Sequence, residues 1–382
     1  MKTVLRLCAV LIALAMSVVT AGSAQAGSPK WLSISTSDSH TCGIRTDHSL
    51  YCWGRNTEGE LGLGATGARH KPTRVGTSTS WVSVAAGGAQ TCALHNSGSI
   101  YCWGENSAGE IGQGNTSTGY NTPTKVGSST SWKSVTVGFL HVCALHSSGS
   151  IYCWGGNGDG QVGNGTPNDV HAPAKVGSST HWLSVTATDS FHTCARHSSG
   201  SIYCWGNNDS GELGIGNNTA VHYVPTKAGT STSWTSVTVG SDSSCARHNS
   251  GSIYCWGYNG TGQLGDGTTT THYTPTKVGT STSWTAVRAG SQHTCAQHSG
   301  GTLYCWGDNQ YGALGDGTGL NHLTPTKVGA SIDWAALAVG RYGTCAISTG
   351  GYAYCWGKND QGQLGIGSIT DAHAPTKITA TN

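Results

Sequence analysis

Charged residues, phenylalanine and methionine are all scarce in this chain of 382 residues. Asp, Glu, Lys and Arg make up 10% of it, the net charge is +2, and basic residues form no run. Nucleic-acid binding normally leaves a clustered Lys/Arg footprint, so we expect no nucleic-acid partner. Phe and Met occur twice each, whereas Trp and Tyr occur 14 times each. So uneven a use of large apolar side chains indicates one unit that has been copied many times.

Long apolar runs are also missing. The run over 7–19 is shorter than the roughly 20 residues that span a membrane, and no other run approaches that length, so we expect no membrane insertion. This run follows Lys2 and Arg6 and precedes Ala24-Gln25-Ala26, an order typical of a secretory signal peptide. We therefore predict a signal peptide over 1–26 and a mature chain over 27–382 that is secreted to the extracellular space or the periplasm.

Seven tandem repeats of about 50 residues fill the mature chain. Each unit opens with one tryptophan and contains a second in a Cys-Trp-Gly marker, which accounts for all 14 tryptophans. No linker or second domain remains, so 27–382 is predicted to be one domain. The units begin at Trp31, Trp81, Trp132, Trp182, Trp234, Trp284 and Trp334.

Each unit has the pattern of four short strands and no helix. In the second unit, 81–84 alternates with period two, and 91–95 and 100–103 are β-rich runs separated by Asn96-Ser97-Gly98. A fourth run follows a proline and precedes the next unit. Four strands repeated seven times predict an all-β fold, a seven-bladed β-propeller of four-stranded antiparallel blades.

The two ends of the chain predict how the ring closes. The first unit lacks a preceding proline-containing strand, and the last unit ends with a spare one. We therefore expect the segment Thr376-Lys377-Ile378 to complete the blade that Trp31 opens.

Every unit also carries the pattern Trp-Gly-x-Asn-x-x-Gly-x-(Leu/Ile/Val)-Gly-x-Gly, from 53–64 in the first to 356–367 in the last. Glycines at fixed offsets indicate positive φ angles or close chain approach in a long connection. A phosphate-cradling loop is the alternative, and it is disfavoured because no helix follows to supply amide donors.

The copy over 256–265, Trp-Gly-Tyr-Asn-Gly-Thr-Gly-Gln-Leu-Gly, resembles the repeat of the regulator of chromosome condensation family. The resemblance covers 31–378 and implies a seven-bladed propeller, but one fold hosts many functions. Founding members of that family exchange nucleotide on a nuclear GTPase, an activity not expected of an exported chain. Secreted bacterial relatives include an inhibitor of β-lactamases, which has shorter repeats and lacks these cysteines.

Apart from Cys8, the cysteines form seven pairs whose partners are ten residues apart in the sequence. If 96–98 is a three-residue turn closed by glycine, the two cysteines of a unit oppose each other directly, within disulfide reach. Six units have glycine at this turn position, and the first has His48. Metal ligation and free thiols are the alternatives, but the spacing is unlike metal sites and disulfides persist after export. The expected disulfides are Cys42–Cys52, Cys92–Cys102, Cys143–Cys153, Cys194–Cys204, Cys245–Cys255, Cys295–Cys305 and Cys345–Cys355.

No motif assembles a catalytic nucleophile with a base, so we expect no enzyme activity and no cofactor. Three carboxylates, Glu60, Glu110 and Glu212, replace the glutamine of the repeat motif, where a structural role is expected. Five histidines recur just before the tight turn of successive units and should be spread around one rim. Such spacing does not bring three or four metal ligands together, so no metal site is expected. They are His95, His146, His197, His248 and His298.

Two positions vary freely between units, the loop before the first cysteine and the residue after Cys-Trp-Gly. Because strand direction alternates, both should emerge on one face, with the constant turns on the other. Both phenylalanines of the protein lie in the variable loop of adjacent units, and exposed aromatics on rigid loops often anchor partners. Neutral drift on a solvated face is the alternative. The predicted binding residues are Phe139, Leu140, Phe191, Arg341, Tyr342 and Tyr258.

Together these patterns predict a secreted, monomeric, non-catalytic propeller that binds an extracellular protein or glycan through this face. A structural or adhesive surface component is an alternative of another class, and inhibition of a secreted enzyme is a special case of binding.

Overall fold

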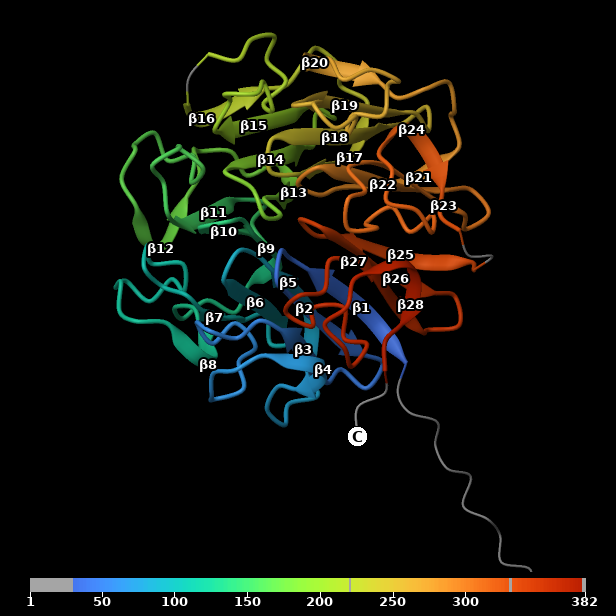
Figure 1. Cartoon of the computed structure of the whole chain (residues 1–382). Helices are drawn as coiled ribbons and strands as arrows, with labels where there is room; N and C mark the ends of the chain where they lie inside the picture. The colour runs from blue at the N-terminus through green and yellow to red at the C-terminus, as the bar shows by residue number, and fades with distance from the viewer. Residues whose placement is uncertain (1–29, 220, 330–331, 380–382) are drawn as a thin grey trace, which may run out of the picture.

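The structure, a computed structural model, describes residues 30–219, 221–329 and 332–379. The predicted signal peptide and Cys8 lie outside these residues. The described chain forms 28 strands in seven antiparallel four-stranded sheets, arranged as the blades of a ring (Figure 1). The predicted seven-bladed propeller is confirmed. Within the described ranges no helix is long and apolar enough to cross a membrane.

Each blade uses four consecutive strands, and blades are numbered 1 to 7 along the chain. The first strands, each opened by a unit's tryptophan, are β1 (Trp31–Thr36), β5 (Trp81–Ala86), β9 (Trp132–Val137), β13 (Trp182–Thr186), β17 (Trp234–Val239), β21 (Trp284–Ala289) and β25 (Trp334–Val339). Residues from five of them line a central cavity of about 180 Å³, which places the first strands innermost.

The second and third strands form the cysteine hairpins. The second strands are β2 (His40–Arg45), β6 (Gln90–His95), β10 (His141–His146), β14 (His192–His197), β18 (Ser243–His248), β22 (His293–His298) and β26 (Gly343–Ser348). The third strands are β3 (Leu50–Gly54), β7 (Ile100–Gly104), β11 (Ile151–Gly155), β15 (Ile202–Gly206), β19 (Ile253–Gly257), β23 (Leu303–Gly307) and β27 (Ala353–Gly357).

The fourth strands contain the proline runs and lie at the outer edge of each sheet. They are β4 (Arg69–Arg74), β8 (Tyr120–Lys125), β12 (Val170–Lys175), β16 (His222–Lys227), β20 (His272–Lys277), β24 (His322–Lys327) and β28 (Ala372–Lys377). Proline is tolerated there because an edge strand has one row of amides that pairs with no neighbour.

The cysteine hairpins have the predicted register. In β6 and β7, Cys92 lies directly opposite Cys102. Their Cα atoms are 4.1 Å apart and the sulfurs are bonded, and all seven pairs are joined in this way within their own hairpins. The turn glycine adopts the left-handed conformation, with φ of 74° at Gly98, and His48 adopts it in blade 1 with φ of 61°. Turn geometry therefore sets the cysteine pairing.

The predicted ring closure, in which the last strand completes the first blade, is wrong. β28 pairs with β27 of its own blade, with Lys377 opposite Tyr354. β4 likewise pairs with β3, with Arg74 opposite Tyr51. Each proline-containing strand follows its own hairpin along the chain and folds back onto it, so blade 1 already has four strands.

The ring instead closes through side-chain packing and the hydrogen bonds that join other neighbouring blades. Ile378 of blade 7 is buried in a cluster that includes Trp53 of blade 1. The Trp53 indole Nε1 donates to Gln363 O at 2.9 Å, and the Trp31 amide donates to Gly351 O at 3.0 Å. Figure 1 shows the first and last blades side by side.

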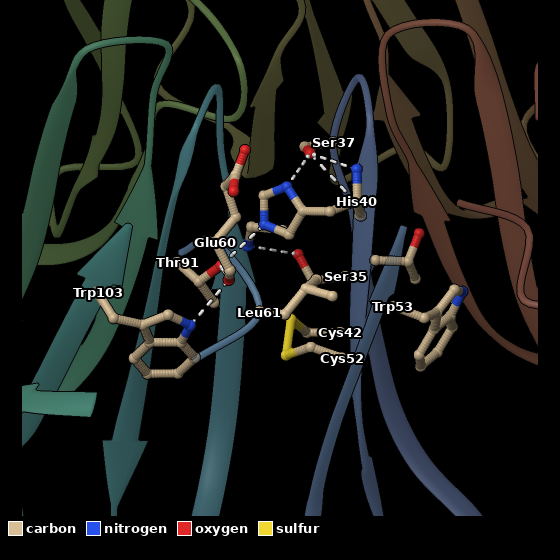
Figure 2. Close-up of a disulfide and its surroundings, with 12 residues drawn as sticks. Ser35, Ser37, His40, Cys42, Cys52, Trp53, Glu60, Leu61, Thr91 and Trp103 are labelled. Atoms are coloured by element: carbon tan, nitrogen blue, oxygen red, sulfur yellow. Dashed lines mark hydrogen bonds between the residues drawn. A yellow bond between two sulfur atoms is a disulfide. The ribbon is translucent and has the colours of Figure 1, made fainter. Parts of the chain in front are cut away.

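The glycine-rich motif connects neighbouring blades. Between blades 1 and 2, the Trp103 indole Nε1 donates to Glu60 O at 2.8 Å, and the Thr91 hydroxyl donates to the same oxygen at 2.8 Å (Figure 2). A Cβ on Gly62 would lie 2.8 Å from that indole nitrogen, so the approach requires glycine. The side chain of Asn56 is buried and accepts from the Leu61 amide at 3.0 Å. The motif is thus structural, as expected.

A buried histidine adds a second link between blades. The His40 Nε2 lies 2.8 Å from the Thr91 hydroxyl (Figure 2). Because that hydroxyl donates its proton to Glu60 O, the imidazole is the donor. Burial, with a smaller contribution from the Arg55 charge, lowers the pKa of His40 to about 3. The His40 imidazole is therefore neutral in the folded protein at neutral pH.

Candidate interaction surface

The two variable positions lie on one face, as predicted, and are hydrogen-bonded to each other. In blade 3 the amide of Gly156, which follows Cys-Trp-Gly, donates to Leu140 O of the variable loop at 2.7 Å. In blade 5 the Tyr258 amide donates to Asp242 O at 2.8 Å. The corresponding bond is present in every blade, at 2.7 to 3.1 Å. We call the surface made by these loops and the residues that follow Cys-Trp-Gly the variable face.

The structure brings the two phenylalanines into contact. The ring centroids of Phe139 and Phe191 are 5.0 Å apart, with an interplanar angle of 43°. They come from the loops after β9 and β13 in adjacent blades, and the Phe139 amide donates to Ser190 O at 3.1 Å between these loops. Both phenylalanines and Leu140 are half-buried. Apolar side chains of this kind, held by backbone bonds yet open to solvent, commonly anchor a partner.

A second cluster surrounds Arg341 and Tyr342 on blade 7. The Tyr342 and Tyr311 ring centroids are 5.5 Å apart. The Lys358 ammonium lies 5.4 Å from the Tyr342 centroid, and the Arg341 guanidinium carbon lies 5.3 Å from it. Tyr311 and Lys358 were not among the predicted site residues. Lys358 follows a Cys-Trp-Gly marker and could have been included for that reason, whereas Tyr311 lies in the glycine-rich connection of the neighbouring blade.

Tyr258 stands apart from both clusters. It is 38% exposed, and within the described ranges no ring contact joins it to either group. Its backbone lies on the variable face, but its ring packs over its own connection, so that a Cβ on Gly260 would meet the phenol oxygen.

A buried carboxylate, Asp189, lies in the same loop as Phe191. The spacing from the opening tryptophan to the first cysteine is one residue longer in blade 4 than in the other blades, and Asp189 in this loop has a φ of 49°. It is 6% exposed, and neither carboxylate oxygen has a hydrogen-bond partner. Burial, with a smaller contribution from the Asp38 charge, raises the pKa of Asp189 to about 7, while the Arg341 charge acts in the opposite direction. The variable loops of blades 1, 4 and 7, which carry Asp38, Asp189 and Arg341, thus interact electrostatically with one another.

The other residues considered for chemistry have structural partners. Burial raises the pKa of Glu110 to about 7 and of Glu212 to about 8, and each carboxylate accepts a backbone amide two residues earlier, at 2.9 Å. The five rim histidines pack edge to face on the opening tryptophan of their own blades, at 5.2 to 5.6 Å. In the part of the chain that the structure describes, His, Cys, Asp and Glu form no group of three or more suited to a metal ion.

Comparison with known proteins agrees with the repeat pattern. The profile of the RCC1-like domain matches residues 15–296, and that of the regulator of chromosome condensation (RCC1) repeat matches 300–347 and 350–382. Human probable E3 ubiquitin-protein ligase HERC4 is 31% identical over 140 residues, which cover 36% of this chain and 13% of that protein. The ultraviolet-B receptor UVR8 of Arabidopsis thaliana is 32% identical over 239 residues, covering 61% of this chain and 54% of the receptor.

The matched segments are thus a small part of HERC4 and about half of UVR8. Among solved structures, Prp20p of Saccharomyces cerevisiae has a TM-score of 0.77 at 22% identity, covering 87% of this chain and 86% of that one. This likeness shows the fold. Because the RCC1-like domain profile spans more than half of the chain and every blade carries the repeat motif, the chain belongs to the RCC1-like domain family.

Proposed function

We propose that this protein is an exported, monomeric, non-catalytic propeller that binds a protein partner through its variable face. The contact between Phe139 and Phe191 carries the proposal, because it concentrates the only two phenylalanines of the chain at one surface point. Aromatic residues and arginine are enriched in protein interfaces and their energetic centres. The cluster of Arg341, Tyr342, Tyr311 and Lys358 supplies both kinds of group on the same face.

Two further observations support the proposal. Seven intrachain disulfides fit an oxidising compartment, as expected for an exported protein. Protein binding also has a precedent on this fold, since the Prp20p structure is described with its binding properties to Gsp1p and histones. The structural motif residues of this chain are buried between blades, whereas the aromatic clusters of the variable face remain open to solvent.

The test compares capture of a partner by wild type and by the double variant Phe139→Ala/Phe191→Ala. Purified proteins are immobilised and exposed to culture medium and to cell-envelope extract, and captured proteins are identified by mass spectrometry. Burial of one such aromatic in a partner is worth on the order of 2 kcal/mol, about thirtyfold in affinity. We therefore expect a defined protein to bind wild type and to be lost from the double variant, at nearly unchanged Tm.

The matched control is Leu183→Ala in the same blade as Phe191. Leu183 is 47% exposed, but it lies near the start of β13, at the end of the blade opposite the variable loop. This variant should retain the partner. Equal capture by all three proteins, or a large fall in Tm for the double variant with capture unchanged, would refute the assignment of this face.

A further inference from the structure

Three pockets of the same composition recur on blades 4, 5 and 6, at the end of the blade where the constant turns lie. Each crosses one blade from its innermost to its outermost strand and is bordered by the Gly-Ser/Thr segment that enters from the preceding blade. Their volumes are about 270, 320 and 260 Å³. The blade residues that line them are Trp182, His197, Tyr203 and Pro225; Trp234, His248, Tyr254 and Pro275; and Trp284, His298, Tyr304 and Pro325.

The rings in each pocket are held in one arrangement. In blade 4 the Trp182 ring lies 5.3 Å from His197 and 5.5 Å from Tyr203, centroid to centroid, with both contacts edge to face. The His197 Nε2 is 3.3 Å from the hydroxyl of Ser179, which also lines the pocket. Blade 6 repeats this geometry, including an imidazole–serine hydrogen bond at 3.2 Å. The pockets are therefore built alike rather than being chance irregularities of the surface.

The lining defines the chemistry of a ligand. No Asp, Glu, Lys or Arg lines any of the three pockets, so a ligand has no charge to match. The aromatic rings and proline offer apolar surface to C–H groups, while serine and threonine hydroxyls and imidazole nitrogens offer hydrogen bonds. Because the rings pack against one another, they present a corner rather than a box of ring faces such as a cation would favour. Volumes near the lower end of the range for ligand pockets, about 300 to 1,000 Å³, suit one small ring.

We propose that these pockets are repeated binding sites for a single neutral sugar unit, and that the propeller binds glycans multivalently through its constant-turn face. A pyranose ring has the required combination of an apolar C–H face and a rim of hydroxyl groups. Single sites of this kind bind weakly, but linked sites can raise the overall affinity by about 10² to 10⁴ without any new contact. This inference concerns the face opposite the proposed protein-binding surface and does not rest on that proposal.

Sequence equivalence extends the sites to five blades. Blades 2 and 3 carry the same ring trio, with tryptophan–histidine and tryptophan–tyrosine centroid distances of 5.4 to 5.6 Å. Blades 1 and 7 differ, because Arg45 and Ser348 stand where the other blades have histidine. In blade 1 the Arg45 guanidinium covers the rings, 5.1 Å from the Trp31 centroid and 4.3 Å from the Tyr51 centroid. We therefore assign no sugar site to these two blades.

The experiment uses saturation-transfer NMR with glucose, galactose, mannose and N-acetylglucosamine, followed by binding to dextran, galactan, mannan and soluble chitin oligomers. Wild type should receive saturation transfer with at least one sugar, and the matching polymer should bind about a hundredfold more tightly than the monosaccharide. The test variant is His197→Ser/His248→Ser/His298→Ser, which copies the residue that blade 7 naturally has. It should fold with seven disulfides and lose at least tenfold in polymer affinity.

The control is Phe139→Ala/Phe191→Ala, which alters the variable face and should bind the polymer like wild type. Absence of saturation transfer with every sugar of the panel, or undiminished polymer binding by the folded triple variant, overturns the proposal. Loss of polymer binding in the phenylalanine variant alone would place the glycan on the variable face and would also overturn it. Failure here leaves protein capture by the variable face unaffected, so the two proposals are tested separately.

Discussion

Replacing Glu212 with glutamine should stabilise the propeller at neutral pH. Glu212 is 1% exposed, and burial raises the pKa of its carboxyl to about 8. One oxygen accepts from the Ser210 amide at 2.9 Å, while the other is buried without a hydrogen-bond partner. At the same motif position blade 7 has Gln363, whose Oε1 accepts from the Gln361 amide at 2.9 Å. An amide can therefore make the structural bond without an ionisable group.

The magnitude follows from proton linkage. A carboxyl group with an ordinary pKa of 4.5 in the unfolded chain and about 8 in the folded protein binds its proton more tightly when folded. Between these values the unfolded chain releases the proton first, so the free energy of unfolding falls by about 1.4 kcal/mol per pH unit. At pH 7 the loss is roughly 3 kcal/mol, and below pH 4.5 it vanishes. Glutamine removes this loss.

The assay is urea denaturation, followed by tryptophan fluorescence, of wild type and Glu212→Gln at pH 5, 6, 7 and 8. At pH 7 the free energy of unfolding of the variant should exceed that of wild type by about 1 to 3 kcal/mol, the order of magnitude given by the linkage relation. This excess should shrink toward pH 5. The converse variant, Gln363→Glu, should be less stable than wild type, and its deficit in the free energy of unfolding should grow as the pH rises from 5 to 8. A difference between wild type and Glu212→Gln that does not grow with pH, or a less stable variant at pH 8, would refute the reasoning.

Three further outcomes follow from the fold. Cys194→Ser/Cys204→Ser should lower the free energy of unfolding by roughly 2 kcal/mol, since the loop that the bridge closes is short, and non-reducing peptide mapping of wild type should find every bridge within one hairpin. Burial lowers the pKa of His192 to about 3. The stability gained by keeping this imidazole neutral is therefore fully present above pH 6.5 and is lost progressively as the pH falls from 6.5 toward 3. His192→Gln, which copies blade 2, should therefore flatten the pH dependence of stability between pH 6.5 and 4, as urea midpoints would show. Truncation after Gly367 should lower the Tm, because it removes β28 and the buried Ile378 from the contact between blades 7 and 1; an unchanged Tm would contradict this packing account.

Much of the candidate surface could be predicted from the chain alone. Strand alternation was enough to place the loop containing Phe139 on the same face as Tyr258, because each hairpin reverses the chain direction. The direct contact between Phe139 and Phe191 and the inclusion of Tyr311 could not be predicted in this way. Such contacts depend on how closely neighbouring blades approach, which no spacing within one repeat specifies.

Features that depend on short-range geometry were predictable from the chain alone: seven repeats, hairpin register and the pairing of Cys92 with Cys102. A three-residue turn fixes the register in which the two strands of the hairpin pair, and in that register the two cysteines lie opposite each other. Two features depend on the assembled ring: β28 stays in its own blade, and the ring closes by packing around Trp53. A long connection, 358–371, joins β28 to β27, and the entropy of closing a loop grows only slowly with its length, so loop length alone did not decide between the hairpins of blades 7 and 1. The choice was made by the hydrogen-bond ladder to β27 and by burial of Ile378 against both blades, which are properties of the assembled ring.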